Sequence, residues 1–230
     1  MTQQKTDLQS FAETIGHRFS DLELLAQALT HPSSMVRGGG PSNQRFEFLG
    51  DRVLGLTIAE SLLVQFPEEG EGEISRRHSA LVRRDTLADV ARAIGLGAQI
   101  YLAKSEEMSG GRDNPALLAD CCEALIAAIY LDGGLEAAQA FVARHWQPLI
   151  DGAVDPPVDA KTALQEWAQA RGLSLPRYKV TERSGPDHAP EFTVEVRLKG
   201  FDAERAIGAT KRAAEQAAAN ALLVRLASRD

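Results

Sequence analysis

Two pairs of carboxylates in the first half of the chain have the spacing that metal chemistry requires. Glu47 and Asp51 are four residues apart, and Asp120 and Glu123 are three apart. In a helix, each of these spacings places both members of a pair on a common face, here beside bulky apolar neighbours. Like charges that lose water together are costly unless a cation neutralises them, and hard oxygen ligands suit Mg²⁺. The four acids therefore favour a magnesium site.

An acidic pair at helical spacing is more often a solvated helix face, and the residues alone leave this interpretation open. Residues 117–131 are apolar nearly all round, which is typical of a buried helix. Ala124 and Ala127 share the face of Asp120 and Glu123, so small side chains leave room around the two carboxylates. This context favours the metal site, but spacing alone does not establish that the two acidic helices meet.

The elements that would position these acids are helices. Apolar residues recur at spacings of three and four through residues 22–56, and strand-like alternation is absent there. Breaks rich in glycine, proline or polar residues separate the helical stretches at 37–42, 66–72 and 109–111. The pattern predicts an all-α domain over residues 1–150. A Pro-Pro pair in a short polar stretch predicts an extended linker over residues 151–158.

The pattern changes to a small α+β unit over residues 159–230. Apolar alternation predicts three strands between two amphipathic helices, and two helices can cover one face of such a sheet. Thr210 is placed to cap the last helix. The expected elements are a helix at 160–170, strands at 177–183, 191–198 and 203–207, and a helix at 211–227.

Charge divides the chain in the same place. The formal net charge of −7 counts at first sight against a nucleic-acid partner, because phosphate binding depends on Lys and Arg. From Asp159 onward, however, there are 12 Lys and Arg against 10 Asp and Glu, so this part is +2 and the preceding part is −9. An acidic body joined to a mildly basic module is compatible with nucleic-acid binding by the module.

The remaining composition narrows the class of protein. Cys121 and Cys122 are the only cysteines, are adjacent, and lie in an apolar stretch, so a disulfide framework and a paired-ligand zinc site are excluded. We expect them to be core thiols. No signal-like segment opens the chain and no long uncharged apolar run follows, which predicts a cytoplasmic protein without a membrane partner.

The second unit offers three polar clusters. They are Thr162, Gln165 and Glu166 on its first helix, His188 in a Gly-Pro-Asp-His turn, and Lys211 with Arg212 at the start of its last helix. A helix N-terminus that carries two cations favours an anion, because backbone N–H groups and side-chain charge point at the same phosphate. A solvated first turn is an equally good explanation of these two cations taken alone.

The acidic segments resemble the signatures of the ribonuclease III family. The family pattern Asn-Glu-Arg-Leu-Glu-Phe-Leu-Gly-Asp is close to residues 43–51, and its Leu-Ala-Asp-x-x-Glu-Ala helix is close to residues 118–124. The resemblance implies that Glu47, Asp51, Asp120 and Glu123 hold Mg²⁺, with Mn²⁺ as an acceptable substitute. It also implies catalytic roles for Asp51 and Glu123 above all, and no organic cofactor.

Residues 159–218 are similar to the double-stranded RNA-binding domain that accompanies this family in bacteria. Such domains contact two minor grooves and the phosphates between them over about 16 base pairs. The similarity implies that Gln165 and Glu166, with Thr162, meet one minor groove and that His188 meets the next. It assigns Lys211 and Arg212 to phosphates. The family also implies a homodimer whose two acidic clusters cut opposite strands, which leaves 5′-phosphates, 3′-hydroxyls and short 3′ overhangs.

One departure concerns Gln44, where the family pattern commonly has Glu. An amide hydrogen-bonds but brings no negative charge. If the usual Glu orients water or RNA, Gln44 serves with modest loss, and if it helps to hold a second metal, that metal binds more weakly. We therefore expect an active enzyme, and its affinity for Mg²⁺ depends on which of these two roles residue 44 has.

Two rival functions remain from the residues alone. A double-stranded RNA-binding scaffold with a degenerate nuclease domain predicts metal-independent binding without cleavage, and Gln44 is its only support. A metal-dependent hydrolase of a small phosphate ester leaves the second unit without a role. The preferred interpretation is hydrolysis by in-line attack of a water that Mg²⁺ activates. Its expected substrates are duplexes in ribosomal precursor, messenger and other structured RNAs.

Overall fold

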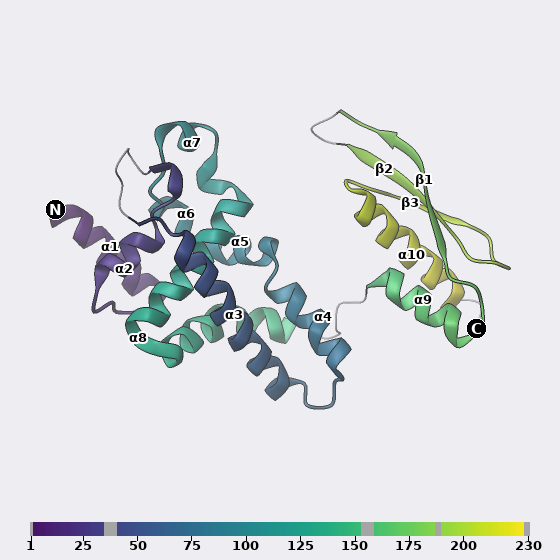
Figure 1. The fold of residues 1–230 in the computed structure, drawn as a ribbon, viewed down its shortest axis with the longest axis horizontal. Helices are drawn as coiled ribbons and strands as arrows, with labels where there is room; N and C mark the ends of the chain where they lie inside the picture. The colour runs from purple at the N-terminus through teal and green to yellow at the C-terminus, as the bar shows by residue number, and fades with distance from the viewer. Residues whose placement is uncertain (1, 35–40, 153–158, 187–189, 228–230) are drawn as a thin grey trace. The chain divides into compact units, whose positions relative to one another are not determined.

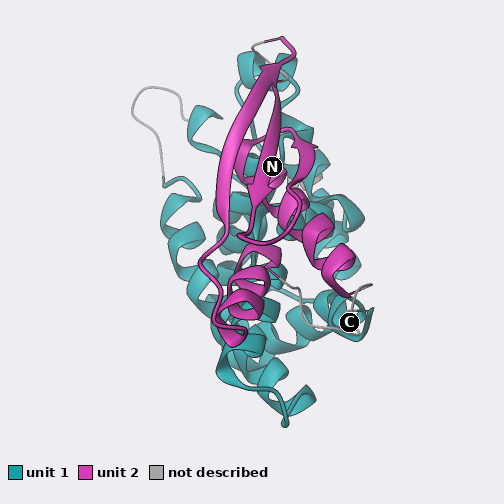
Figure 2. Cartoon of the chain, turned by 90° about the vertical axis from the view of Figure 1, so that its right-hand side faces the viewer, with its two compact units in different colours: residues 1–157 teal, residues 158–230 magenta. Residues whose placement is uncertain are grey.

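The chain divides into two compact units, residues 1–157 and 158–230 (Figures 1 and 2). The computed structural model describes residues 2–34, 41–152, 159–186 and 190–227. Among these residues the first unit is helical apart from one bridge between Thr30 and Tyr101. The second has the order α-β-β-β-α, so the predicted fold class is confirmed. The finer division into 1–150, 151–158 and 159–230 stays a prediction.

The helices of the first unit follow one another through short connections. Their bounds are α1 (Thr2–Ile15), α2 (Leu22–Ala28), η1 (Pro32–Ser34), α3 (Gln44–Gln65), α4 (Glu71–Leu81), α5 (Arg84–Ala93), α6 (Leu96–Gln99), α7 (Lys104–Met108), η2 (Gly111–Asp113) and α8 (Pro115–Gly152). No described helix combines the length and apolar character that crossing a membrane requires.

Helix α8 is the centre of this unit. Its first half is apolar nearly all round, as expected of a helix with neighbours on every side, and α3 packs along it. The helix is kinked at Gly134, whose φ of 76° and ψ of −174° favour glycine. The two cysteines are free and buried, which confirms the prediction of core thiols.

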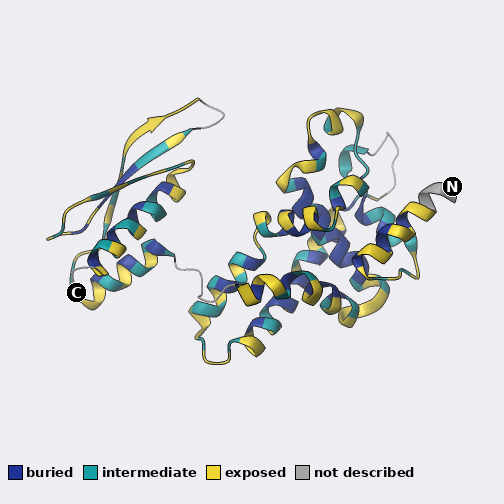
Figure 3. Ribbon diagram, turned by 180° about the vertical axis from the view of Figure 1, so that it is seen from behind, coloured by how far each residue is buried: buried dark blue, intermediate teal, exposed yellow. Residues whose placement is uncertain are grey.

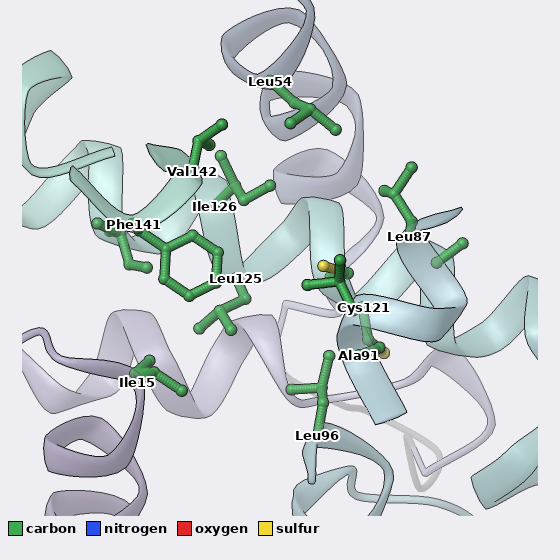
Figure 4. Close-up of a cluster of buried hydrophobic side chains, with 14 of the residues drawn as sticks. Ile15, Leu54, Leu87, Ala91, Leu96, Cys121, Leu125, Ile126, Phe141 and Val142 are labelled. Atoms are coloured by element: carbon green, nitrogen blue, oxygen red, sulfur yellow. The ribbon is translucent and has the colours of Figure 1, made fainter. Parts of the chain in front are cut away.

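The core of the first unit gathers buried side chains from α1, α2, α3, α4, α5, α6 and α8, and Figure 4 shows part of it. Buried residues are concentrated where these helices face one another, and exposed residues line their outer faces (Figure 3). Trp146 is fully buried and its indole N–H donates to the carbonyl of Leu81 at 3.0 Å, so α8 is tied to the end of α4. Figure 4 labels Ile15, Leu54, Leu87, Ala91, Leu96, Cys121, Leu125, Ile126, Phe141 and Val142.

The second unit is a three-stranded antiparallel sheet with both helices on one face (Figure 1). Its elements are α9 (Ala160–Ala170), β1 (Arg177–Ser184), β2 (Glu191–Arg197), β3 (Glu204–Gly208) and α10 (Lys211–Ala227). Both helices have the predicted bounds. The strand ends differ from the prediction by one residue, because pairing of Ser184 with Glu191 extends β1 and the ladder of β2 with β3 runs from Glu204 to Gly208.

Both helices of this unit are capped by side chains. The Asp159 carboxylate accepts the backbone N–H of Thr162 at 2.9 Å. The Thr210 hydroxyl accepts the backbone N–H of Ala213 at 3.1 Å, which confirms the predicted cap. These caps fix the first turns of α9 and α10, which carry Thr162, Lys211 and Arg212.

Candidate metal centre and nucleic-acid interface

The start of α3 is anchored on α8 through Asn43. This residue is buried, its side-chain amide donates to the sulfur of Cys121 at 3.2 Å, and its backbone N–H donates to the carbonyl of Thr30 at 2.9 Å. The Asn43 side chain makes no capping bond to α3. The first turn of α3, which carries Glu47, is therefore held against the acidic turn of α8.

Gly50 sets how closely α3 and α8 approach. A Cβ at Gly50 would lie 1.8 Å from the backbone oxygen of Glu123, a distance that no real side chain can occupy. Only glycine lets the two backbones touch here. The contact lies between Glu47 and Asp51 along α3, so it brings the first acidic pair beside the second. This is the step that spacing alone could not establish.

The structure gathers three of the four predicted acids. Carboxylate oxygens of Glu47, Asp120 and Glu123 all lie within 4.8 Å of one another, and each residue is partly buried. Burial first, and then the charges of Asp51, Glu47 and Asp120, raise the pKa of Glu123 to about 8. Burial and the neighbouring acids also raise the pKa of Glu47. The trio therefore concentrates negative charge that repels itself, and a cation would relieve this repulsion.

Asp51 lies outside this trio. Its carboxylate is paired with the guanidinium of Arg52, the next residue on α3. Its charge still raises the pKa of Glu47 and of Glu123, which places it in the electrostatic neighbourhood of the cluster. The metal-ligand geometry therefore involves Glu47, Asp120 and Glu123, while Asp51 is engaged by Arg52.

Two basic groups from distant parts of the sequence act on Asp120. Burial raises the pKa of Asp120, and the charges of Arg84 and His31 oppose this rise. Arg84 begins α5, and the His31 ring is hydrogen-bonded to the Ser33 hydroxyl at 2.8 Å. Neither residue has a spacing relation to Asp120, so only the fold could reveal them.

Gln44 is exposed at the first turn of α3. Its side-chain carbonyl accepts the hydroxyl of Ser42 at 3.4 Å. This contact engages the side-chain carbonyl within the segment that leads into α3. Gln44 thus lies one turn before Glu47, and the described residues include no hydrogen bond from it to the trio.

Four of the predicted RNA-binding residues meet in the second unit. Thr162 and Gln165 from α9 and Lys211 and Arg212 from α10 line a hollow of about 590 Å³. Glu166 is exposed on α9 but does not line it, and His188 lies outside the described residues. The remaining lining residues are Asp159, Lys161, Glu215 and Gln216.

Lys161 is a third cation of this hollow, in addition to the predicted Lys211 and Arg212. Its ammonium donates to the carboxylate of Glu215 at 2.6 Å, and Lys211 lies 3.9 Å from the same residue. Gln216 donates to Asp159 at 2.7 Å, which links α10 to the cap of α9. The hollow therefore presents three cations on a rigid pair of helix N-termini.

Comparison with known proteins fits both sites. Residues 21–149 match the family described as Ribonuclease-III-like, and residues 160–226 match the double-stranded RNA binding motif. Ribonuclease 3 of Cereibacter sphaeroides is 55% identical over 225 residues, covering 98% of both chains. The chain belongs to the ribonuclease III family. Ribonuclease 3 of Rhodobacter capsulatus is 54% identical over 220 residues and covers 96% of each chain.

Solved structures of the family agree with the first unit. The nuclease domain of the Campylobacter jejuni ribonuclease III superposes with a TM-score of 0.58 at 35% identity, covering 61% of this chain and 96% of that domain. A second structure of that nuclease domain gives 0.56 at 36% identity, covering 65% and 96%. As a member of the ribonuclease III family, the protein is a hydrolytic endoribonuclease with a double-stranded RNA-binding module. This confirms what the sequence resemblance implied.

Proposed function

We propose that the chain hydrolyses phosphodiester bonds of double-stranded RNA with Mg²⁺ held by Glu47, Asp51, Asp120 and Glu123. The meeting of Glu47, Asp120 and Glu123 within 4.8 Å carries this proposal. Their donor set is all carboxylate oxygen, which suits Mg²⁺, and Mn²⁺ would substitute. Bound Mg²⁺ would supply Lewis acidity and lower the pKa of a water for in-line attack.

The residues of the chain have separable tasks in this reaction. Glu123 is the most strongly perturbed acid, so it would keep its proton in the free protein and lose it when a cation binds. Asp51 would leave Arg52 to complete the ligand set. Once freed, Arg52 would be available to an RNA phosphate. Gly50 and Asn43 would hold the acids in register and touch no substrate.

A homodimer is supported by the outer face of α3. Phe48, Leu56 and Leu63 are 66%, 57% and 63% exposed and fall within one stripe of the helix. An exposed apolar stripe of this kind favours burial against a second copy of the chain. The similar nuclease domain from Campylobacter jejuni has a region involved in dimer formation. Two clusters per dimer would cut opposite strands and leave 5′-phosphates, 3′-hydroxyls and short 3′ overhangs.

The second unit would hold the duplex through the hollow between α9 and α10. Lys161, Lys211 and Arg212 would meet phosphates, and Thr162 and Gln165 would meet 2′-hydroxyls. Glu166 and His188 remain expected contacts of the two minor grooves. Duplexes in ribosomal precursor, messenger and other structured RNAs are the proposed substrates, in the cytoplasm.

The test is cleavage of a long end-labelled duplex RNA, with products separated on a denaturing gel. Wild-type protein should cut in Mg²⁺ and in Mn²⁺ but not in EDTA, and Glu123→Gln should cut at least about 10²-fold more slowly. Glu136→Gln is the matched control, because it removes one exposed carboxylate from the same helix outside the cluster. Its rate should equal the wild-type rate.

Three outcomes would contradict the proposal. Cleavage in EDTA would show that the reaction does not need a metal. A wild-type rate for Glu123→Gln would show that Glu123 is not part of the site. Duplex binding without cleavage in every condition would favour the scaffold.

The dimer has a test of its own, sedimentation of the wild type and of Phe48→Glu. A dimeric wild type with a monomeric Phe48→Glu would support the dimer, and a monomeric wild type would overturn it.

A further inference from the structure

A second basic hollow lies at the far end of the sheet in the RNA-binding unit. It has a volume of about 540 Å³ and lies between the segment that enters β1 and the turn that joins β2 to β3. Arg177, Arg197 and Lys199 line it, and no carboxylate is among its lining residues. None of these residues belongs to the hollow between α9 and α10.

Two of these cations oppose each other directly. Arg177 and Arg197 are cross-strand partners on β1 and β2, so their Cβ atoms are about 5 Å apart. Like charges at such positions destabilise a sheet unless something neutralises them. Arg177 and Lys199 have no ion-pair partner among the described residues, and Asp202 lies nearby in sequence without lining the hollow. An anion in this hollow would relieve the repulsion.

Arg197 is held in place for such a ligand. Its guanidinium donates to the carboxylate of Glu195 at 2.5 Å, and Arg205 lies 2.7 Å from the other oxygen of the same carboxylate. The Glu195 side chain is only 4% exposed, although it lies on the sheet face away from the helices. One acid thus orients Arg197, and the outer end of the sheet keeps a net positive charge.

The floor of the hollow is apolar. Leu175 is exposed and lines it together with Phe201, whose ring packs edge-on against Trp167 at 5.6 Å between centroids. Cations beside an aromatic and aliphatic floor suit a ligand that combines a phosphate with a planar base. An acidic peptide would satisfy the cations but would leave this floor without a planar partner.

We propose that this hollow binds single-stranded RNA that flanks the duplex, with a phosphate on Arg177, Arg197 and Lys199 and an unstacked base over Leu175 and Phe201. Duplex RNA offers no free base, so the strand must lie outside the paired region. Because the same unit holds the duplex, a flanking strand reaches the hollow at high effective concentration. This inference goes beyond the proposed cleavage reaction and does not depend on the acidic cluster.

The test compares two labelled RNAs by fluorescence anisotropy with the full-length protein in EDTA, which prevents metal-dependent cleavage. One is a blunt duplex of about 16 base pairs. The other carries the same duplex with a single-stranded extension of about ten nucleotides. Wild-type protein should bind the extended RNA about tenfold more tightly. Its slope of log affinity against log salt should be steeper by about 0.7, as expected for one more phosphate of a single strand.

The double variant Arg177→Gln with Lys199→Gln should lose this advantage and keep its affinity for the blunt duplex. Lys179→Gln is the matched control, since it removes one exposed cation from the same strand and the same face without touching the hollow. It should keep the advantage. If the double variant loses helicity, the two single variants should each remove about half of the added slope.

Three results would overturn the inference. An equal affinity of wild-type protein for both RNAs would show that no such site operates. An equal loss of the preference for the extended RNA in Lys179→Gln would show that the preference comes from the overall positive charge of the unit and not from the hollow. Competition by poly-glutamate as strong as that by single-stranded RNA would assign the hollow to an acidic protein. Failure to bind even the blunt duplex would instead count against the proposed function, so the two failures are distinguishable.

Discussion

The two candidate sites of this chain treat charge in opposite ways. In the first unit Glu47, Asp120 and Glu123 gather like charges in a partly buried place, and their pKa values rise. In the second unit Lys161 and Lys211 lie beside Glu215, so the charges of the hollow are partly balanced before any ligand arrives. An added cation would therefore complete the first site. A polyanion that displaces counterions would be the matching ligand of the second.

The largest expected effect comes from the contact that builds the first site. Gly50→Ala places a Cβ against the backbone of Glu123, so α3 and α8 must separate. We expect the free energy of unfolding of the nuclease unit to fall by about 3 kcal/mol, with loss of cleavage. Urea unfolding followed by Trp146 fluorescence would measure it, in a Trp167→Phe background that leaves one indole.

Gly72→Ala is the control for this change. Gly72 lies in α4 and a Cβ there meets only the end of the flexible Arg76 side chain at 3.7 Å. It should keep full activity and stability or gain slightly, because alanine favours a helix over glycine. Wild-type stability in Gly50→Ala would show that the close approach of α3 and α8 is not required.

The second effect is a dependence of stability on pH that only the first site should show. Burial and neighbouring acids raise the pKa of Glu123 from 4.5 to about 8. Between these two pH values Glu123 is protonated in the native state and ionised in the unfolded state. The contribution to stability is present near pH 5 and is lost as pH rises through about 8. We expect a loss of about 1 to 2 kcal/mol after solvent screening.

Urea unfolding of metal-free protein from about pH 5 to about pH 8 checks this expectation. Glu123→Gln should flatten the profile, because the amide does not titrate. Saturating Mg²⁺ should also flatten it, since the cation stabilises the charged form. A profile that is equally steep in Glu123→Gln would assign the proton to another group.

The sequence predicted the second unit more completely than the first site. The bounds of α9 and α10, the cap at Thr210, and the polar residues of their first turns were predicted from local pattern. Local pattern suffices because a helix N-terminus is a site that neighbouring residues build.

The acidic cluster depends on contacts between distant segments. Periodicity predicted that α3 and α8 are helices with acidic faces. It indicates which face of a helix is buried, but not which other helix packs against that face. Gly50 against Glu123, Asn43 against Cys121, and the charges of Arg84 and His31 near Asp120 arise only in the folded chain. The pairing of Asp51 with Arg52 is a rotamer choice that spacing does not determine.

A smaller effect is expected at the hollow between α9 and α10. Lys211→Gln should lower the affinity for a blunt duplex by about three- to tenfold and reduce the slope of log affinity against log salt by about 0.9. Anisotropy at several salt concentrations measures both. Lys179→Gln removes a cation from the outer face of the sheet. Its effects on the affinity and on the salt slope should each be less than half of those of Lys211→Gln. An equal change would mean that net charge alone governs duplex binding.

The smallest effect should appear where the chain departs from its family. Gln44 is exposed, one turn before Glu47, and its carbonyl is engaged by Ser42. Gln44→Glu adds a negative charge at the edge of the cluster, so the Mg²⁺ concentration for half-maximal cleavage should fall by about two- to tenfold. Gln9→Glu adds the same charge to the exposed face of α1 and should leave it unchanged. A higher rate at saturating Mg²⁺ in Gln44→Glu, with an unchanged metal requirement, would instead assign residue 44 to positioning RNA.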